Sequence, residues 1–309
     1  MINEVKLKEV FSMTFQKKFL TVIMFVCITF AFSACDLASL IPGTPSAKDI
    51  LSKCEKASSD AKSMKVNLNM DMKISTQGQS MDMKVLSISS VFTKPSKTMT
   101  ETSITLFAGN PVTTTTQYME TSGNNYVVYT KAADKWSKST INLDTYKKMF
   151  GTANVSDFVK QFASVYKNVE LKKSEKLNGT DVNVLVLTIS GDKMSSLLNG
   201  IMPSLGNNTS LLNIKGLKDL TSTFYIDKST NLPVKMTMDL TDYINTIIKY
   251  MTQNSSATSS ENAQLNNIKY DKVSFELVYS DYNSVKEFTI PTEAKTASEV
   301  SISSISITK

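Results

Sequence analysis

Residues 64–74 read Met-Lys-Val-Asn-Leu-Asn-Met-Asp-Met-Lys-Ile, so every second side chain along this stretch is apolar. A period of two places the apolar side chains on one face of a β-strand and the Lys, Asn and Asp side chains on the other. A strand with one dry and one wet face is typical of an antiparallel sheet that is covered on one side. The stretch therefore predicts a sheet with a continuous apolar face.

The residues on either side of this strand predict a helix and a hairpin. Apolar residues before the strand, Cys54 among them, recur at spacings of three and four, which indicates a helix over 47–62 with Cys54 on its buried face. After the strand, a loop over 76–80 contains Gly78, and alternation resumes at Met81. We therefore expect a helix, a long strand and a hairpin partner, in that order.

Further strands are expected where Thr-rich or alternating segments are bounded by turn residues. They lie at 97–107, 111–121, 125–131, 169–177, 180–190, 221–227, 232–242, 268–281 and 285–290. Helices are expected at 142–150 and 156–167, the latter with Tyr166 on its buried face. Residues 192–220 are expected to be irregular and mostly helical, and the polar residues 252–266 a loop. The order of elements predicts an α+β fold built on antiparallel strands.

The N-terminal segment has the parts of a secretory signal. Lys17 and Lys18 precede an uncharged apolar run over 19–32, and the small residues Ser33 and Ala34 lead to Cys35. This run is shorter than the roughly 20 apolar residues that a membrane-spanning helix needs. We therefore expect export, with a retained signal anchor or secretion without lipid as the alternatives. Translation from Met13 instead of Met1 would give a more ordinary signal.

Phe32-Ser33-Ala34-Cys35 resembles the lipobox of bacterial lipoproteins. The resemblance implies that the Cys35 thiol receives a diacylglyceryl group and that the chain is cleaved before Cys35. Dual acylation is enough for stable residence in a membrane, so the membrane is the expected partner, reached through lipid on Cys35 at the extracytoplasmic face. The expected domains are a lipoprotein signal peptide at 1–34, a lipidated tether at 35–46, a folded domain at 47–294 and a Ser-rich C-terminal tail at 295–309.

Composition removes most catalytic and metal chemistry. The 309 residues include no His, and all 34 basic residues are Lys. Neither a Ser-His-Asp triad nor a His-ligated zinc site can form without His. Cys54 alone remains once Cys27 leaves with the signal and Cys35 carries lipid, so an internal disulfide is excluded. We expect no enzyme, no metal and no cofactor. The net charge of +6 is not clustered, so nucleic acid is not an expected partner.

Two weaker motifs have simpler interpretations. The Ser-x-x-Lys strings at 59–62 and 164–167 resemble the nucleophile motif of penicillin-interacting enzymes, but no Lys-Thr-Gly or Ser-Asp-Asn accompanies them. The run Asn67, Asn69, Asp71 lacks the Gly and the final carboxylate of a calcium-binding EF-hand loop. We interpret these three residues as the outward-facing side chains of the strand over 64–74.

Methionine is concentrated on the expected dry faces of the strands. Its flexible thioether side chain suits surfaces that adapt to varied apolar shapes, although it also fills ordinary cores. The candidate ligand-lining residues are Met64, Leu68, Met70, Met72, Met81, Met83, Val234, Met236, Met238 and Leu240. The sequence leaves open whether this face is a ligand cavity or a filled core.

Three segments resemble bacterial lipoproteins with a LolA-like fold, particularly an uncharacterised group of Gram-positive lipoproteins. They are AKDILSKCEKASSDAKSMKVNLNMDMKIS (47–75), FYIDKSTNLPVKMTMDL (224–240) and FTIPTEAKTA (288–297). The resemblance implies a curved antiparallel sheet that forms an incomplete β-barrel closed by helices. It further implies that the protein binds a lipid or another hydrophobic ligand. The alternative is a cell-envelope sensor or protein-interaction lipoprotein without a small-molecule ligand, whose protein partner the sequence does not name.

Overall fold

The computed structural model describes residues 44–76, 79–93, 96–106, 113–142, 166–195, 216–254 and 268–300. Helix α4 spans Pro45–Asp60, α8 spans Thr241–Asn254 and α10 spans Thr292–Lys295. The strands are β1 (Ser63–Thr76), β2 (Gln79–Thr93), β3 (Ser96–Leu106), β4 (Thr113–Ser122), β5 (Asn125–Ala132), β6 (Lys135–Asn142), β7 (Tyr166–Leu177), β8 (Thr180–Ile189), β9 (Leu220–Asp227), β10 (Pro233–Asp239) and β11 (Ile268–Ser280).

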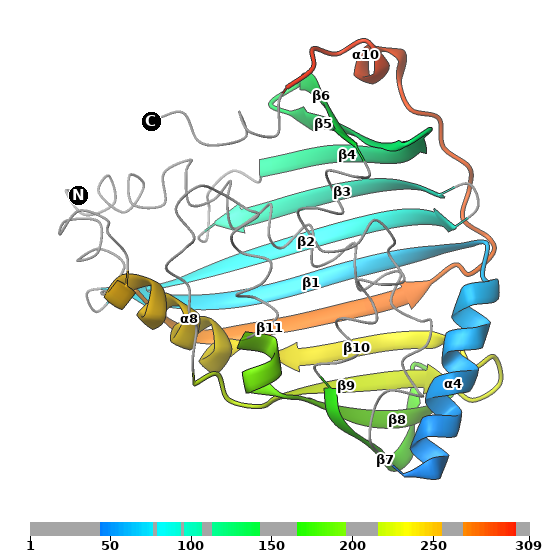
Figure 1. Cartoon of the computed structure of the whole chain (residues 1–309), viewed down its shortest axis with the longest axis vertical. Helices are drawn as coiled ribbons and strands as arrows, with labels where there is room; N and C mark the ends of the chain where they lie inside the picture. The colour runs from blue at the N-terminus through cyan, green and yellow to red at the C-terminus, as the bar shows by residue number, and fades with distance from the viewer. Residues whose placement is uncertain are drawn as a thin grey trace.

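The strands form a single curved sheet with the order β6-β5-β4-β3-β2-β1-β11-β10-β9-β8-β7 (Figure 1). All neighbouring strands in it are antiparallel. The sheet is open, because β6 and β7 are its two ends and do not pair with each other. The predicted architecture, a curved antiparallel sheet that does not close and that carries helices, is confirmed.

Strand β1 lies in the middle of the sheet and determines which face is dry. Met70 on β1 lies opposite Val85 on β2 and opposite Phe275 on β11. Directly paired residues in an antiparallel sheet point to the same face, so the alternation of β1 continues across its neighbours. We call the face that carries Met70 the inner face, and the opposite face, which carries Asn69, the outer face.

Helices α4 and α8 pack on the inner face. Thr44 begins α4, where its Oγ1 accepts a hydrogen bond from the Ala47 backbone N–H (3.4 Å), and Pro45 occupies the first turn, as helix N-termini favour. Leu51 and Cys54 of α4 belong to the same buried cluster as β1, which confirms the predicted helix and its buried Cys54. Helix α8 packs against β11 near the other end of the strands (Figure 1).

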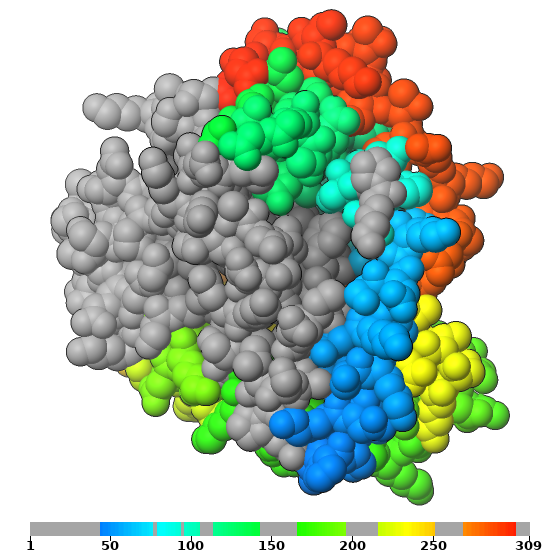
Figure 2. Space-filling model, turned by 45° about the vertical axis from the view of Figure 1, so that its right-hand side comes forward, coloured from blue at the N-terminus to red at the C-terminus, as the bar shows by residue number. Residues whose placement is uncertain are grey.

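The outer face of β4 and β5 is covered by the segment that follows β11. Tyr118, Val127 and Tyr129 form a second buried cluster with Ile290 and Ala294. Figure 2 shows this C-terminal segment, in orange and red, against the green strands, with α4 in blue exposed at the surface. The strand predicted at 285–290 is wrong: these residues have no strand pairing, and Phe288 and Ile290 instead pack their side chains onto the sheet.

Several boundaries differ from the sequence predictions. Tyr166 begins β7 and does not end a helix, although it is buried as predicted. Strand β10 ends at Asp239, whereas the sequence predicted a strand to 242. Helix α8 follows and continues to Asn254, into the loop that was predicted to begin at 252. Strand β6 was not predicted. The helix predicted at 142–150, most of those at 156–167 and 192–220, the remaining loop to 266 and the signal segment lie outside the described residues.

Candidate ligand-binding face

Eight of the ten residues predicted to line a ligand site lie in one buried cluster on the inner face. They are Met64, Leu68, Met70 and Met72 on β1, Met81 and Met83 on β2, and Met236 and Met238 on β10. None is more than 8% exposed. We call this set the methionine cluster. Its members come from three strands, and β11, which separates β1 from β10, contributes the aromatic and aliphatic side chains between them.

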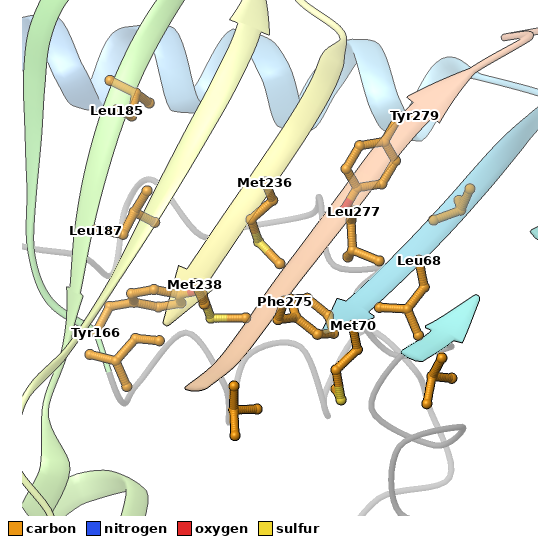
Figure 3. Packing of buried hydrophobic residues seen from close by; sticks show 14 of the residues in the cluster. Leu68, Met70, Tyr166, Leu185, Leu187, Met236, Met238, Phe275, Leu277 and Tyr279 are labelled. Carbon is orange, nitrogen blue, oxygen red and sulfur yellow. The ribbon is translucent and has the colours of Figure 1, made fainter. Parts of the chain in front are cut away.

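The strand register arranges these side chains in rows across the sheet. Met70 lies opposite Phe275, and Phe275 lies opposite Met238, so one row alternates methionine and an aromatic ring. Figure 3 shows these three side chains on the same face of β1, β11 and β10. The next row runs from Leu68 through Leu277 to Met236. Thioethers make favourable contacts with aromatic rings and adapt to irregular shapes, so these rows form a deformable apolar surface.

The two remaining predicted residues lie differently. Leu240 follows β10 and is half-buried against the cluster. Val234 is also half-buried but lies outside the cluster, because a β-bulge between Pro233 and Lys235 interrupts the alternation. Lys235 lies on the outer face, where its Nζ pairs with Glu276.

The buried cluster on the inner face also includes residues of strands on which no ligand-lining residue was predicted. Buried side chains of β7, β8, β9 and β11 join it, and they include Tyr166, Leu185, Leu187, Ile226, Phe275, Leu277 and Tyr279. Figure 3 shows most of them beside the methionine cluster. Alternation within those segments marked their apolar face. The missing information was the strand order, which places β11 next to β1 and the β7–β10 strands beyond it.

The inner face is uncharged where these strands are described. The inner-face positions of β1, β2, β9, β10 and β11 carry apolar, hydroxyl or amide side chains and no Lys, Asp or Glu. Charged residues of the same strands alternate onto the outer face, where Lys84 pairs with Asp71 and Lys65 with Asp281. Within the described strands this face therefore presents apolar surface and no charged group.

Polar residues on the inner face are mostly hydroxyls, and on β2 and β3 they include two hydrogen-bonded pairs. Ser87 and Thr102, on β2 and β3, lie 3.1 Å apart through their hydroxyl oxygens, and Ser89 and Thr100 lie 2.9 Å apart. All but Ser89 are buried. The inner face therefore changes from apolar on β1 and β10 to hydroxyl-rich on β3.

Burial favours the neutral form of three ionisable side chains on this side of the protein. Burial raises the pKa of Tyr166 and of Tyr270 to about 12, and it raises the pKa of the Cys54 thiol to about 12. Among the described residues, no three Cys, Asp or Glu side chains gather where a metal ion could be held. Nor is any helix within the described ranges long and apolar enough to cross a bilayer. Cys35 lies outside them.

The fold and this face together define an open antiparallel sheet with an uncharged, methionine-rich inner surface. A model of the family of unknown function DUF6612 matches residues 46–299, and the chain belongs to that family. No curated protein is significantly similar to the chain.

Solved structures show distant similarity. The lipoprotein LppX from Mycobacterium tuberculosis aligns with 79% of this chain and 98% of its own, at 15% identity and a TM-score of 0.40. LprF from Mycobacterium bovis aligns with 81% of this chain and 98% of its own, at 15% identity and a TM-score of 0.40. A putative outer membrane lipoprotein-sorting protein domain from Vibrio parahaemolyticus aligns with 77% of this chain and 93% of its own, at 12% identity and a TM-score of 0.22.

Proposed function

We propose that this protein is a lipid-anchored, extracytoplasmic binding protein that holds a lipid or another apolar ligand against the inner face of its sheet. The anchor in this proposal is the diacylglyceryl group on Cys35, joined to the domain by a short tether that ends where α4 begins. The protein acts by binding, without catalysis and without a cofactor.

The observation that carries the proposal is the uncharged methionine cluster. A stable core is built best from Leu, Ile and Val, whose rotamers are well defined, whereas Met specifies packing poorly. Here Met occupies successive inner-face positions of β1, β2 and β10, and the rows of the sheet bring these positions together. Such a surface can repack around ligands of different shape, which is the property that adaptable binding surfaces use.

The experiment measures binding of an apolar fluorescent probe to purified protein from which co-purified lipid has been removed. Wild-type protein should bind the probe, and Met70→Trp or Met238→Trp should weaken binding, because indole fills space that the ligand needs. The same substitutions should lower the free energy of unfolding by only about 1–3 kcal/mol, since a face that accepts ligands has room for the ring.

A matched control is Met99→Trp, which changes a methionine on the outer face of β3 that packs against the second cluster. This variant should keep its affinity for the probe. Wild-type protein that binds no probe after lipid removal would overturn the proposal and leave the sensor or protein-interaction alternative. A large loss of stability in both inner-face variants with unchanged probe affinity would also contradict it, because a filled core is overpacked by Trp.

A further inference from the structure

The inner face carries a row of uncharged polar side chains across the half of the sheet that β2 to β6 form (Figure 1). The strand register defines this row, because each member lies directly opposite the next. Directly opposed residues have Cβ atoms about 4.5–5.5 Å apart and point to the same face, so the side chains follow one another across the strands. The row, which we call the hydroxyl row, consists of Ser89, Thr100, Gln117, Thr130 and Ser137.

Hydrogen bonds join neighbours in the hydroxyl row. The hydroxyl oxygens of Ser89 and Thr100 lie 2.9 Å apart, and Gln117 Nε2 donates to Thr130 Oγ1 (3.1 Å). Ser137 Oγ donates to the Thr130 carbonyl (3.4 Å). A hydroxyl has one donor and two acceptor sites, and an amide nitrogen has two donors. Two hydroxyls that share one hydrogen bond therefore keep a second O–H donor, which a ligand can use without breaking the row.

Thr98 is an independent sign that this part of the face binds a polar group. Its Oγ1 is buried and has no hydrogen-bond partner, and the residue is 3% exposed. Thr98 comes two residues before Thr100 on β3, so both side chains point to the inner face. A buried hydroxyl without a partner is unfavourable, because it has lost its hydrogen bonds to water. Native proteins keep few such groups, and each one calls for an explanation such as a bound water or a ligand.

The polar half of the inner face adjoins the methionine cluster. Ser87 on β2, whose hydroxyl oxygen lies 3.1 Å from that of Thr102, lies opposite Leu68 on β1. From Leu68 the same row of the sheet continues through Leu277 to Met236. One row of side chains therefore passes from hydroxyls on β3 and β2 to apolar groups on β1, β11 and β10. The inner face is thus amphipathic along a single direction, as an amphiphilic ligand is.

Charge on the polar half is confined to its margin. Among the described inner-face positions of β2 to β6, the one charged residue is Lys135, which is exposed at the β5–β6 turn. Other charged side chains of these strands alternate onto the outer face, where Lys97 pairs with Glu287 (2.7 Å). A buried phosphate or ammonium needs a compensating charge, which the hydroxyl row does not offer. The row suits an uncharged group that both donates and accepts hydrogen bonds, as a polyol does.

We propose that the β2–β6 half of the inner face binds the uncharged polyol head of an amphiphilic lipid, whose hydrocarbon lies along the methionine cluster. The inference rests on the proposed function and names the ligand class: a lipid that carries a sugar or another uncharged polyol. Thr98 and the hydroxyl row hydrogen-bond the hydroxyls of the head. Lipids with charged heads are disfavoured, because their charge would be buried without a partner.

The test compares three pyrene-labelled probes that share one alkyl chain and differ in the head: a glucoside, a methyl-capped triethylene glycol ether and a phosphate. The ether is polar and uncharged but cannot donate a hydrogen bond. Lipid-stripped wild-type protein should bind the glucoside roughly tenfold more tightly than the ether, as expected for one or two net hydrogen bonds, and the phosphate more weakly than the glucoside.

The outcomes separate this inference from the proposed function. Equal affinity for glucoside and ether would overturn the inference and leave the proposed function standing, and so would tighter binding of the phosphate than of the glucoside. Failure to bind any of the three probes would overturn both.

Variants then assign the preference to the hydroxyls. Thr98→Val combined with Thr100→Val removes two hydroxyls at nearly constant shape, and Val favours strands, so the fold should be kept. The double variant should bind glucoside and ether with affinities within about twofold of each other, with ether affinity unchanged. Thr116→Val is the matched control, because Thr116 lies opposite Glu101 on the outer face and should leave the preference intact.

Ser89→Ala is a second variant that changes a half-buried hydroxyl of the same row, and it gives a readout even where melting curves show the double variant unfolded. It should reduce the preference for the glucoside by at least about twofold. A full preference retained by the folded double variant or by Ser89→Ala would overturn the inference. So would an equal loss of preference in Thr116→Val, since that result does not depend on the inner face.

Discussion

At the scale of single residues, Cys54 shows how burial controls chemistry. The thiol is 2% exposed on the face of α4 that packs against the sheet, and burial raises its pKa to about 12. A thiolate is the reactive form of cysteine, and an apolar environment suppresses it. A role for Cys54 as a reactive thiol is therefore disfavoured by its surroundings.

We expect Cys54 to react slowly with a thiol reagent in the folded protein. In a chain that starts after Cys35, Cys54 is the one remaining thiol. At about pH 8 the native protein should be labelled at least roughly a thousandfold more slowly than protein unfolded in guanidinium, because both access and the thiolate fraction fall. Cys54→Ala serves as the blank. Labelling of the native state within tenfold of the unfolded rate would contradict the burial of this side chain.

The same pKa shift makes a prediction about pH. The folded state holds the thiol proton more tightly than the unfolded chain, whose cysteine has a pKa of about 8.5. The resulting stability is fully present below that pH and is lost progressively as the pH rises towards the folded value. Urea unfolding should therefore show wild type losing stability relative to Cys54→Ala between about pH 8 and pH 10. A difference that stays constant over this range would exclude a shifted thiol.

Residue-level prediction from sequence succeeded where alternation was uninterrupted and failed at one bulge. The period of two correctly identified the face of Met70, Met72 and Met238. Val234 was assigned to the same face by the same rule. Pro233, which lacks an N–H, precedes it, and strands accommodate proline at bulges. The resulting shift of register between Pro233 and Lys235 depends on pairing with β9, which the local pattern does not contain.

At the scale of elements, α8 substitutes for the missing end of β10. Strand β10 stops at Asp239 and pairs with β11 no further than Ser274, so among the described residues the earlier part of β11 has no partner strand on that side. The Leu240 N–H donates to the Val273 carbonyl (2.8 Å), and the Val273 N–H donates to Thr241 Oγ1 (2.8 Å). Asn245 then bonds both backbone groups of Tyr270, as a neighbouring strand would.

We expect Asn245→Ala to destabilise the protein more than a typical surface change. The substitution leaves the N–H and the C=O of Tyr270 without their partner, and each unsatisfied buried group costs about 1–3 kcal/mol. Denaturant unfolding should show a loss of about 2–4 kcal/mol. Thr246→Ala is the control, since Thr246 makes an exposed hydrogen bond within the same helix and should change stability by less than about 0.5 kcal/mol. Equal losses of stability in the two variants would contradict a stabilising role for the hydrogen bonds between Asn245 and the Tyr270 backbone.

Most elements could be predicted from sequence, and the exceptions have separate physical causes. Tyr243, Ile244 and Ile248 recur at helical spacing, so α8 carried a signal that the strand assignment to 242 obscured. Strand β6 has polar residues on both faces, so its alternation is weak; it is held by pairing with β5 and by Trp136, which packs against the second cluster. Residues 288–290 do alternate, but Phe288 and Ile290 pack on the outer face without entering the ladder. Long-range contacts decide such cases.

At the scale of the whole molecule, the proposed lipid on Cys35 would hold the domain, and with it the inner face, at the extracytoplasmic surface of the membrane. Cys35→Ser should abolish lipid labelling and leave a larger, uncleaved precursor, because lipidation precedes cleavage in the lipoproteins that the lipobox resembles. Metabolic labelling with a fatty acid and gel mobility measure both effects. Ser33→Thr is a control that keeps Cys35, and it should remain lipidated. Processing of the Cys35→Ser chain to the wild-type mass would contradict the lipoprotein assignment.

The position of β1 in the middle of the sheet has a consequence for the order of folding. Strands β1 to β6 form one meander and β7 to β10 form a second that β11 extends, so nearly all pairings join neighbours in the chain. The seam between β1 and β11 is the exception, as the bond between Asn69 and Glu276 across it spans 207 residues. Closing so long a loop is entropically costly and slow. The two meanders can therefore form separately, but the inner face becomes continuous only once β11, the last described strand in the chain, has paired with β1.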